Sequence, residues 1–271
     1  MTKKYLKTGC SKKNSLSVCM LSSGSKGNAV YISDGTTSIL LDAGLSGIKI
    51  QKRLESRGLL PENLDAILVS HEHSDHIRGV GVLSRRFDIP VYINNKTHGA
   101  SPGLGKINRI KTFDCGRDFK INNLKIHPFS VSHDAKDPAG FTITQNGKKI
   151  GVATDLGIAT HMVKEHLKDC SMLIIEANHD PVMLEEGPYP WPLKQRIKSR
   201  VGHLSNEDSK KLLMEVKHDH LSHVLLAHLS EQNNSPEKAK SVVGEALNNS
   251  PTRLSVALQD ICSEVFILAN D

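Results

Sequence analysis

The sequence predicts a single α/β (α+β) domain in which two β-sheets pack together between covering helices, a four-layer αββα sandwich. Short apolar patterns typical of strands alternate with helical patterns along most of the chain, and strand-rich and helix-rich stretches occur twice in succession. The 271 residues contain no Pro/Gly-rich linker, and a chain of this length can bury one large core. We therefore expect one folded domain over 17–271.

In the first half of the chain, Gly and Asp turn signals separate the short apolar runs. The helix over 47–57 has apolar residues at helical spacing and ends at Gly58, and Asp75 is placed to cap the helix over 75–87. The expected elements are strands at 17–23, 29–32, 38–42, 65–70 and 90–93 and helices at 47–57 and 75–87.

The second half repeats this alternation. A QNGK turn joins two strands, Ser205 with Glu207 and Asp208 is typical of a helix start, and Pro236 suits a first helical position. The expected elements are strands at 123–130, 140–144, 149–155, 172–176 and 223–227, helices at 160–169, 205–217 and 236–248, and one or two final strands. The basic, Pro-rich stretch 187–202 is expected to be an irregular arm over the surface.

The charge of the chain is concentrated at its start. The net charge is +6, but the first sixteen residues carry five lysines and no acid, so the remainder is nearly neutral at +1. We expect 1–16 to be a disordered, solubilising tail. Because the body is nearly neutral, any contact with nucleic acid must be local.

The composition also indicates a cellular compartment. No apolar stretch reaches the about 18 residues that span a bilayer, which excludes an integral membrane protein. The five cysteines are dispersed without CxxC spacing, which argues against a disulfide framework or a zinc knuckle. Ser17 interrupts the apolar run after the basic start, which argues against a signal peptide. We expect a cytoplasmic protein that binds no membrane; its oligomeric state stays open.

The strongest chemical signal is the run HEHSDH, which directly follows a predicted buried strand. It places four candidate metal ligands within six residues: His71, His73, Asp75 and His76. Imidazole and carboxylate suit zinc, manganese or iron(II), and the absence of Cys favours a catalytic over a structural site. His71 and His73 point the same way in an extended chain. Asp75 and His76 lie at the turn into a helix, where they are placed to face a second metal.

Three further candidates each follow a predicted strand, as a site at one edge of a sheet sandwich requires. They are His133, Asp155 in GVATDLG and His228 in LLAHLS. Taken alone, each has the ordinary explanation of a hydrogen-bonded loop residue. Together with HEHSDH, they favour a two-metal site.

An HxHxDH run followed by a separate His, an Asp and another His resembles the metallo-β-lactamase superfamily. The resemblance covers 17–271 and implies the metallo-β-lactamase sandwich with two divalent metal ions, Zn²⁺ or Mn²⁺. It implies that His71, His73 and His133 hold one metal, that Asp75, His76 and His228 hold the other, and that Asp155 bridges them. The segments SSGSKGN, HEHSDH, FSVSHDAKDPAGF and GVATDLG are more similar still to the YycJ (WalJ) family of bacterial proteins. That family implies 5′-to-3′ DNA exonuclease activity.

Two further residues bear on the reaction type. Glu176, at the end of a buried strand, and His203, in GHLSN, resemble a Glu–His pair of the tRNA 3′-processing members, in which the His protonates the leaving oxygen. A carboxylate orients an imidazole and keeps a proton on it near neutral pH. An alkoxide leaving group benefits from such a donor, whereas a thiolate does not need one. We predict that His203, Glu176 and Asp75 are catalytic; alternatively, Glu176 caps a loop and His203 is a surface residue.

The predicted substrate-binding residues are Ser23, Asn28, Lys194, Arg196 and Lys198. The first two lie in a Gly-rich segment expected to form a tight loop at the rim of the site. The other three lie in an arm without acids beside Tyr189 and Trp191, a combination that suits a phosphate backbone and stacked bases. The ordinary alternatives are a simple turn and a solvated charged face.

The sequence thus predicts a metal-dependent hydrolase, and favours a phosphodiesterase or nuclease that uses a hydroxide held between two metals. Its partner would be nucleic acid, with DNA favoured over RNA. The alternative enzyme is a small-molecule thioester hydrolase of the glyoxalase type. A metal-stabilised scaffold is disfavoured because it needs none of the seven ligands. The metal and the choice between exonuclease and endonuclease stay open.

Overall fold

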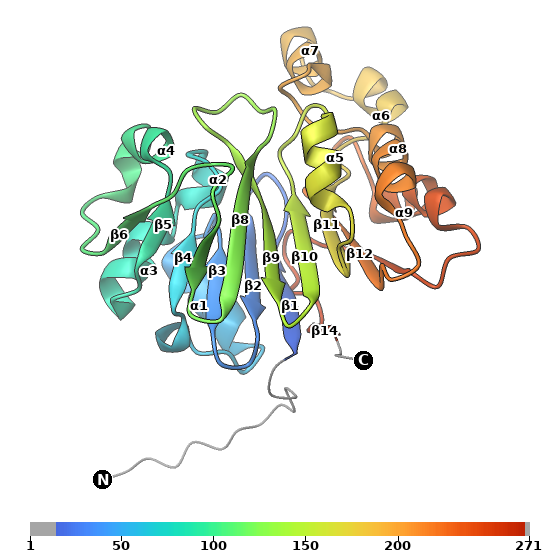
Figure 1. The fold of residues 1–271 in the computed structure, drawn as a ribbon. Helices are drawn as coiled ribbons and strands as arrows, with labels where there is room; N and C mark the ends of the chain where they lie inside the picture. The colour runs from blue at the N-terminus through green and yellow to red at the C-terminus, as the bar shows by residue number, and fades with distance from the viewer. Residues whose placement is uncertain (1–14, 269–271) are drawn as a thin grey trace.

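Two β-sheets lie face to face between two sets of helices in the computed structural model, which describes residues 15–268 (Figure 1). The αββα sandwich that the sequence predicts is therefore confirmed. The predicted disordered tail falls outside the described residues except for Ser15 and Leu16, and Leu16 begins the first strand. The boundaries proposed for the tail and the domain stay predictions.

The first sheet combines the N-terminal half of the chain with its last described strand, in the order β14-β1-β2-β3-β4-β5-β6. Neighbouring strands are antiparallel from β14 to β3 and parallel from β3 to β6. The strands are β1 (Leu16–Ser22), β2 (Ala29–Ser33), β3 (Ser38–Leu41), β4 (Ala66–Leu68), β5 (Val91–Ile93), β6 (Ile110–Thr112) and β14 (Phe266–Leu268).

The second sheet has the order β13-β12-β11-β10-β9-β8-β7, antiparallel from β7 to β10 and parallel from β10 to β13. Its strands are β7 (Phe119–Ile121), β8 (Leu124–Ser130), β9 (Ala139–Gln145), β10 (Lys148–Ala153), β11 (Met172–Glu176), β12 (His223–Ala227) and β13 (Arg253–Val256). β11 and β12 are buried along their whole length, because helices cover one face and the other sheet covers the opposite face.

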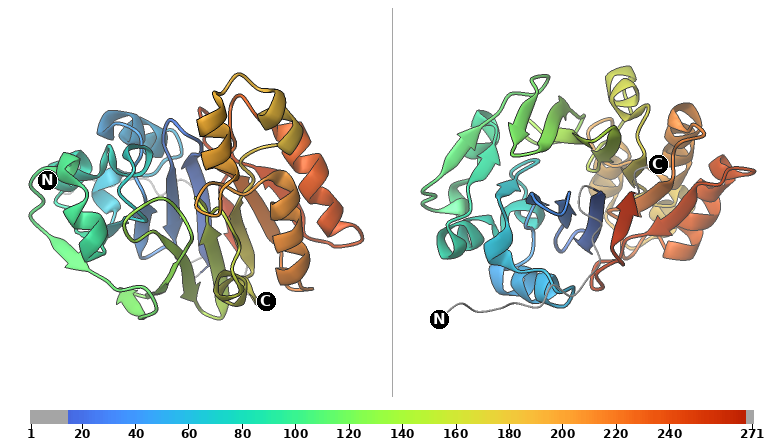
Figure 2. Two further views of the ribbon diagram at one scale, coloured as in Figure 1. Left: turned by 90° about the horizontal axis from the view of Figure 1, so that it is seen from above. Right: turned by 60° about the horizontal axis from the view of Figure 1, so that its bottom comes forward.

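The helices cover the outer faces of both sheets or lie at the ends of the strands, as the views in Figure 2 show. They are α1 (Gly47–Glu55), α2 (Ser74–Ile77), α3 (Val80–Phe87), α4 (Asn95–Gly99), α5 (His161–Leu167), α6 (Pro181–Glu186), α7 (Trp191–Lys198), α8 (Asn206–Val216) and α9 (Pro236–Gly244), with 3₁₀ turns η1 (Pro61–Asn63), η2 (Pro102–Leu104) and η3 (Glu245–Leu247). One apolar cluster fills the space between the sheets. A second packs α5, α8 and α9 on the second sheet, and a third packs α1 and α3 on the first.

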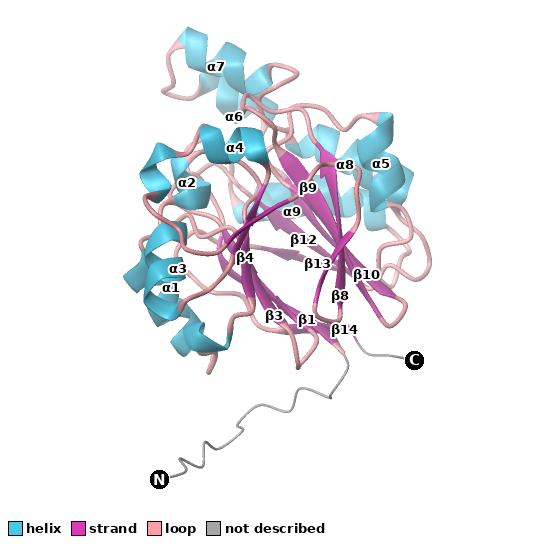
Figure 3. Cartoon of the chain, turned by 60° about the vertical axis from the view of Figure 1, so that its left-hand side comes forward, coloured by secondary structure: helices cyan, strands magenta, loops and turns pink. Residues whose placement is uncertain are grey.

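Two expectations about local structure were wrong. The stretch 187–202 is not irregular throughout, because it contains the helix α7, which stands with α6 above the ends of the strands (Figure 3). The single helix expected over 75–87 is divided into α2 and α3 at Gly79. The Gly79 N–H donates to the Ala43 carbonyl at 2.7 Å, and a Cβ on Gly79 would lie 2.4 Å from the Leu45 carbonyl oxygen. The close approach of this neighbouring loop therefore interrupts the helix.

The described region offers two facts relevant to compartment. None of its helices has the length and apolar character needed to cross a membrane. Its four cysteines, Cys19, Cys115, Cys170 and Cys262, are free. The predicted cytoplasmic location stays a prediction.

Candidate active site

Seven polar side chains from both sheets meet at one edge of the sandwich. HEHSDH runs from the loop after β4 into α2, which contains Asp75 and His76. His133 follows β8, Asp155 follows β10 and His228 follows β12. Their ligand atoms form three overlapping groups, each within 4.8 Å: His71, His73 and His133; Asp75, His76 and His228; and His71, His76 and Asp155. Strands distant in sequence thus bring the predicted metal ligands together, because parallel strands end at a common edge.

Asp155 lies in the middle of this cluster. Its carboxylate oxygens lie 3.4 Å from His76 Nε2, 3.4 Å from His228 Nδ1 and 3.9 Å from His133 Nε2. Burial alone would raise the pKa of Asp155, but His228 and His76 outweigh burial and hold the pKa well below its usual range. The carboxylate therefore stays ionised inside the protein, where it needs a cation close by.

Three buried ligand atoms of the cluster lack a hydrogen-bond partner within residues 15–268, as expected of a metal site. His71 Nε2, Asp155 Oδ2 and His228 Nε2 are buried and have no hydrogen-bond partner among the described residues. Burial holds the pKa of His71 well below its usual value, so its imidazole is neutral and offers a lone pair. Buried polar atoms rarely go unpaired. An imidazole and carboxylate set of this kind suits zinc or manganese, and two bound cations would satisfy all three atoms.

Asp42 orients two of the candidate ligands, and the sequence analysis missed it. Its carboxylate lies 2.7 Å from His76 Nδ1 and accepts hydrogen bonds from the Ser70 N–H (2.8 Å) and Oγ–H (2.7 Å). Because Ser70 Oγ donates to Asp42, it accepts from His71 Nδ1 at 3.0 Å. Both imidazoles are thus held with Nε2 toward the cluster, as a metal ligand requires. The sequence signal that could have indicated Asp42 is its position, an acidic residue directly after the apolar run SILL.

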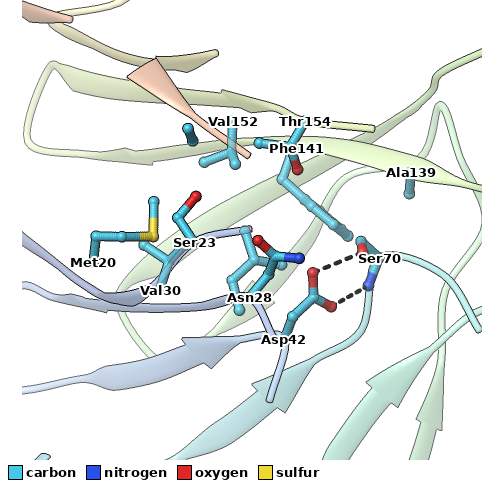
Figure 4. A pocket seen from close by; sticks show the side chains of 12 residues that line it. Met20, Ser23, Asn28, Val30, Asp42, Ser70, Ala139, Phe141, Val152 and Thr154 are labelled. Carbon is cyan, nitrogen blue, oxygen red and sulfur yellow. Dashed lines mark hydrogen bonds between the residues drawn. The ribbon is translucent and has the colours of Figure 1, made fainter. Parts of the chain in front are cut away.

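A small cavity lies beneath the cluster, between the two sheets. Figure 4 shows Asp42 bonded to Ser70 at its edge, with Ser23 and Asn28 nearby and Phe141 from the second sheet. Its volume is about 20 Å³, enough for about one water molecule and too small for a substrate. Substrate must therefore approach from the opposite, outer side of the cluster.

Ser23 and Asn28 lie behind the candidate ligands. Ser23 Oγ accepts a hydrogen bond from the His228 N–H at 2.7 Å. Asn28 Nδ2 donates to Asp75 Oδ2 at 3.2 Å and lies 3.1 Å from His76 Nε2. Both side chains are buried. Their bonds favour a role in positioning ligands over the substrate contact that the sequence analysis predicted.

Glu176 connects the cluster to His203. Glu176 Oε1 accepts from Nδ1 of both His228 (2.7 Å) and His203 (2.8 Å), and Oε2 accepts from the N–H groups of Leu156 and Leu204 (3.0 and 3.1 Å). Burial would raise the pKa of Glu176, but His203 and His228 lower it to about 2. The predicted pair is thus in contact, and His203 Nδ1 is occupied, which leaves Nε2 for another partner.

The arm that carries α7 is fastened to the loop around His133. His133 Nδ1 donates to the Gly202 carbonyl (3.2 Å), Ser132 Oγ donates to the Arg200 carbonyl (2.8 Å), and the Asp134 N–H donates to the Val201 carbonyl (3.1 Å). The bond from Nδ1 leaves His133 Nε2 directed at the cluster. The arm therefore helps to orient a candidate ligand.

The three basic residues predicted to bind substrate are not equivalent. Lys194 donates to the Glu185 carbonyl (2.5 Å), and Lys198 pairs with the Glu185 carboxylate. Both therefore point toward α6. Arg196 forms an ion pair with Asp134 (Nη2–Oδ2, 2.5 Å) and lies close to His203, beside a common cavity. Of the three, Arg196 is the one at the site.

Comparison with known proteins agrees with this architecture. Residues 37–235 match the model of the Beta-lactamase superfamily domain. The metallo-β-lactamase fold protein YhfI from Bacillus subtilis superposes with a TM-score of 0.73 at 18% identity, over 94% of this chain and 100% of YhfI. The chain therefore belongs to the β-lactamase superfamily and has the metallo-β-lactamase fold.

Within the superfamily, two curated relatives are similar over most of the chain. Exodeoxyribonuclease YycJ from Bacillus anthracis is 40% identical over 233 residues, which are 84% of this chain and 88% of YycJ. Exodeoxyribonuclease WalJ from Streptococcus pneumoniae is 40% identical over 225 residues, which are 81% of this chain and 84% of WalJ. The protein is a member of the YycJ/WalJ family.

Proposed function

We propose that the protein is a metal-dependent nuclease, specifically a 5′-to-3′ DNA exonuclease. The observation that carries this proposal is the contact of Glu176 with both His228 and His203, which holds a proton donor beside the candidate metal ligands. A phosphodiester expels an alkoxide and benefits from such a donor, whereas a thioester expels a thiolate and does not. The similarity to exodeoxyribonucleases YycJ and WalJ supports DNA as the substrate.

Seven residues would hold two divalent metal ions. His71, His73 and His133 would bind one, Asp75, His76 and His228 the other, and Asp155 both. When bound, such ions lower the pKa of a water nucleophile and neutralise charge on phosphoryl oxygens.

The remaining residues place these groups and move a proton. Asp42 and Ser70 orient His76 and His71, and Asn28 holds Asp75. Glu176 fixes His203 through Nδ1, so Nε2 delivers its proton to the leaving oxygen as the P–O bond breaks. The nearly neutral body requires local contacts with the DNA backbone, and Arg196 supplies one beside His203.

The test is cleavage of 5′-labelled single- and double-stranded DNA and RNA with Zn²⁺, with Mn²⁺ and with chelator. Asp155→Ala is compared with Asp169→Ala, a matched control, because Asp169 has a similar backbone conformation (φ 58° against 54°) but is exposed and distant from the cluster. We expect release of the labelled 5′-mononucleotide from DNA, abolished by chelator and reduced more than about 100-fold by Asp155→Ala alone, with loss of bound metal.

His203→Ala separates the proton donor from the metal ligands. We expect it to keep its metal and to lose about 10²–10⁴-fold in cleavage rate. Loss of metal would instead make His203 a ligand. If the wild-type protein holds two metals, cleaves no nucleic acid and hydrolyses a glutathione thioester, the thioester hydrolase is the better assignment.

A further inference from the structure

A second cavity, of about 160 Å³, lies beside His203 on the side of the arm. Leu193, Arg196 and Ile197 line it from α7. They are at positions i, i+3 and i+4, which lie on one face of a helix. Tyr189, just before α7, completes this wall. The arm thus covers a space that reaches the proposed proton donor, and of its lining the mechanism above uses only Arg196 and His203.

Most of the remaining lining is polar. Ser25, Asn178 and Ser230 line it. Asn178 Nδ2 is engaged with the His228 carbonyl (2.8 Å), and Ser230 Oγ accepts from the Asn233 N–H (3.2 Å), which leaves the Ser230 hydroxyl hydrogen for another acceptor. Within residues 15–268, the hydroxyl groups of Ser25 and Tyr189 have no hydrogen-bond partner. Tyr189, Leu193 and Ile197 offer aromatic and apolar surface, and the serines and Asn178 offer neutral hydrogen-bonding groups. This combination suits a flat heterocycle with polar edges.

The geometry of the reaction determines which part of a substrate lies here. In an in-line displacement at phosphorus, the nucleophile and the leaving oxygen are on opposite sides of the phosphorus atom. Water forms the new P–O bond, the bond to the leaving 3′-oxygen breaks, and that oxygen takes the proton of His203, which is replaced from solvent. The nucleoside that carries this oxygen therefore extends past His203, into the cavity.

We infer that this cavity binds the base of the nucleotide released from the 5′ end, against Tyr189 and against Leu193 and Ile197 of α7. The assignment rests on the proposed function. The volume is below the ~300–1,000 Å³ of sites for whole drug-sized ligands, so it accepts one ring system rather than a length of strand. A pocket that takes a single base at the leaving side favours release of one nucleotide at a time.

Mononucleotide binding tests the assignment without turnover. Deoxyadenosine 5′-monophosphate and deoxyribose 5-phosphate, which lacks the base, are titrated calorimetrically into the full chain in chelator. Because stacking of a base on an aromatic ring contributes roughly 5- to 150-fold in affinity, we expect the mononucleotide to bind at least about fivefold tighter. Tyr189→Ala should remove this difference, and Tyr189→Phe should keep it.

Trp191→Ala is the matched control, because Trp191 is an aromatic residue of the same arm that is 62% exposed and does not line the cavity. It should preserve the preference for the base. Equal affinity of the wild-type protein for both ligands, or an equal loss of both in Tyr189→Ala, would overturn the assignment.

The cleavage assay separates this inference from the proposed function. We expect Tyr189→Ala to raise KM for a normal 5′ end while kcat changes little, and to leave KM unchanged for a substrate whose 5′-terminal residue is abasic. Normal cleavage without this difference contradicts only the cavity assignment. Selective mononucleotide binding by a protein that cleaves no nucleic acid contradicts the nuclease and retains the cavity as a nucleotide site.

Discussion

Replacing Glu176 by Gln changes the hydrogen bonding at the centre of the site without changing its shape. Glu176 is fully buried, and each carboxylate oxygen accepts two hydrogen bonds: Oε1 from His203 and His228, Oε2 from the N–H groups of Leu156 and Leu204. Gln offers one oxygen that accepts and one nitrogen that only donates. If the amide nitrogen faces Leu156 and Leu204, two buried N–H donors lose their acceptor. If it faces His203 and His228, both imidazoles must turn Nδ1 into an acceptor and carry their proton on Nε2.

The expected effect is large for an isosteric change. Two buried donors without an acceptor cost about 2–6 kcal/mol. In the other orientation all four hydrogen bonds lose their charged acceptor, at roughly 1 kcal/mol each, so the free energy of unfolding falls by a similar amount. For a chain of this size, each kcal/mol shifts Tm by about 2–4 °C. We therefore expect Tm to fall by roughly 4–24 °C.

Circular dichroism during heating, in excess chelator, measures this effect without a contribution from metal loading. The control is Glu165→Gln, which removes an exposed carboxylate paired with Lys168 and should leave Tm nearly unchanged, because exposed ion pairs contribute little to stability. A fall in Tm of less than about 2 °C for Glu176→Gln would show that the four hydrogen bonds are not formed as described.

Two other regions of the molecule give independent predictions. Gly44→Ala should destabilise the protein by roughly 3 kcal/mol or more, because the new Cβ would lie 1.6 Å from the Asp75 carbonyl oxygen. Gly103→Ala, where nothing lies within 4 Å, should leave Tm unchanged, and equal Tm values for both variants would contradict the packing. Burial raises the pKa of Cys19 to about 11 and of Cys170 to about 12, so both stay protonated at pH 8, below either pKa. Because the thiolate is the nucleophile, mass spectrometry should find both alkylated by iodoacetamide only after unfolding; rapid labelling of the native protein would refute this.

The buried parallel strands were the most predictable part of the fold. The expected strands 172–176 and 223–227 agree with β11 and β12 to the residue. Each is a continuous apolar run, and the polar turn residues on either side mark where the strand begins and ends. The ligand candidates were predictable for the same reason. Each follows a recognisable strand, so its place at a sheet edge could be inferred from local sequence alone.

What the sequence did not predict depends on contacts between distant segments. Pro190 and Pro192 made the arm look irregular, yet Pro is well tolerated in the first turn of a helix, where α7 places Pro192. Asp42 carries no motif of its own. Its role arises because β3 pairs in parallel with β4, which brings it beside Ser70 and His76. The role of Asp42 therefore depends on how β3 and β4 pair, which the residue type alone does not indicate.

The left-handed backbone conformation of His228, directly after β12, connects the fold to the candidate site. Eight non-glycine residues among 15–268 have positive φ, and seven of them are Asp or Asn, whose short side chains bond locally and tolerate this conformation. The eighth is His228, with φ 57°. A residue held in this region costs of order 1–3 kcal/mol and persists only where its surroundings fix it.

The surroundings of His228 fix it at three points. Its N–H donates to Ser23 Oγ, its carbonyl accepts from Asn178 Nδ2, and its Nδ1 donates to Glu176. Glycine would relieve the strain but would remove the imidazole from between Asp75 and Asp155. The proposed ligand role of His228 accounts for this strain, and Ser23, in the Gly-rich segment, fixes the backbone that carries the imidazole.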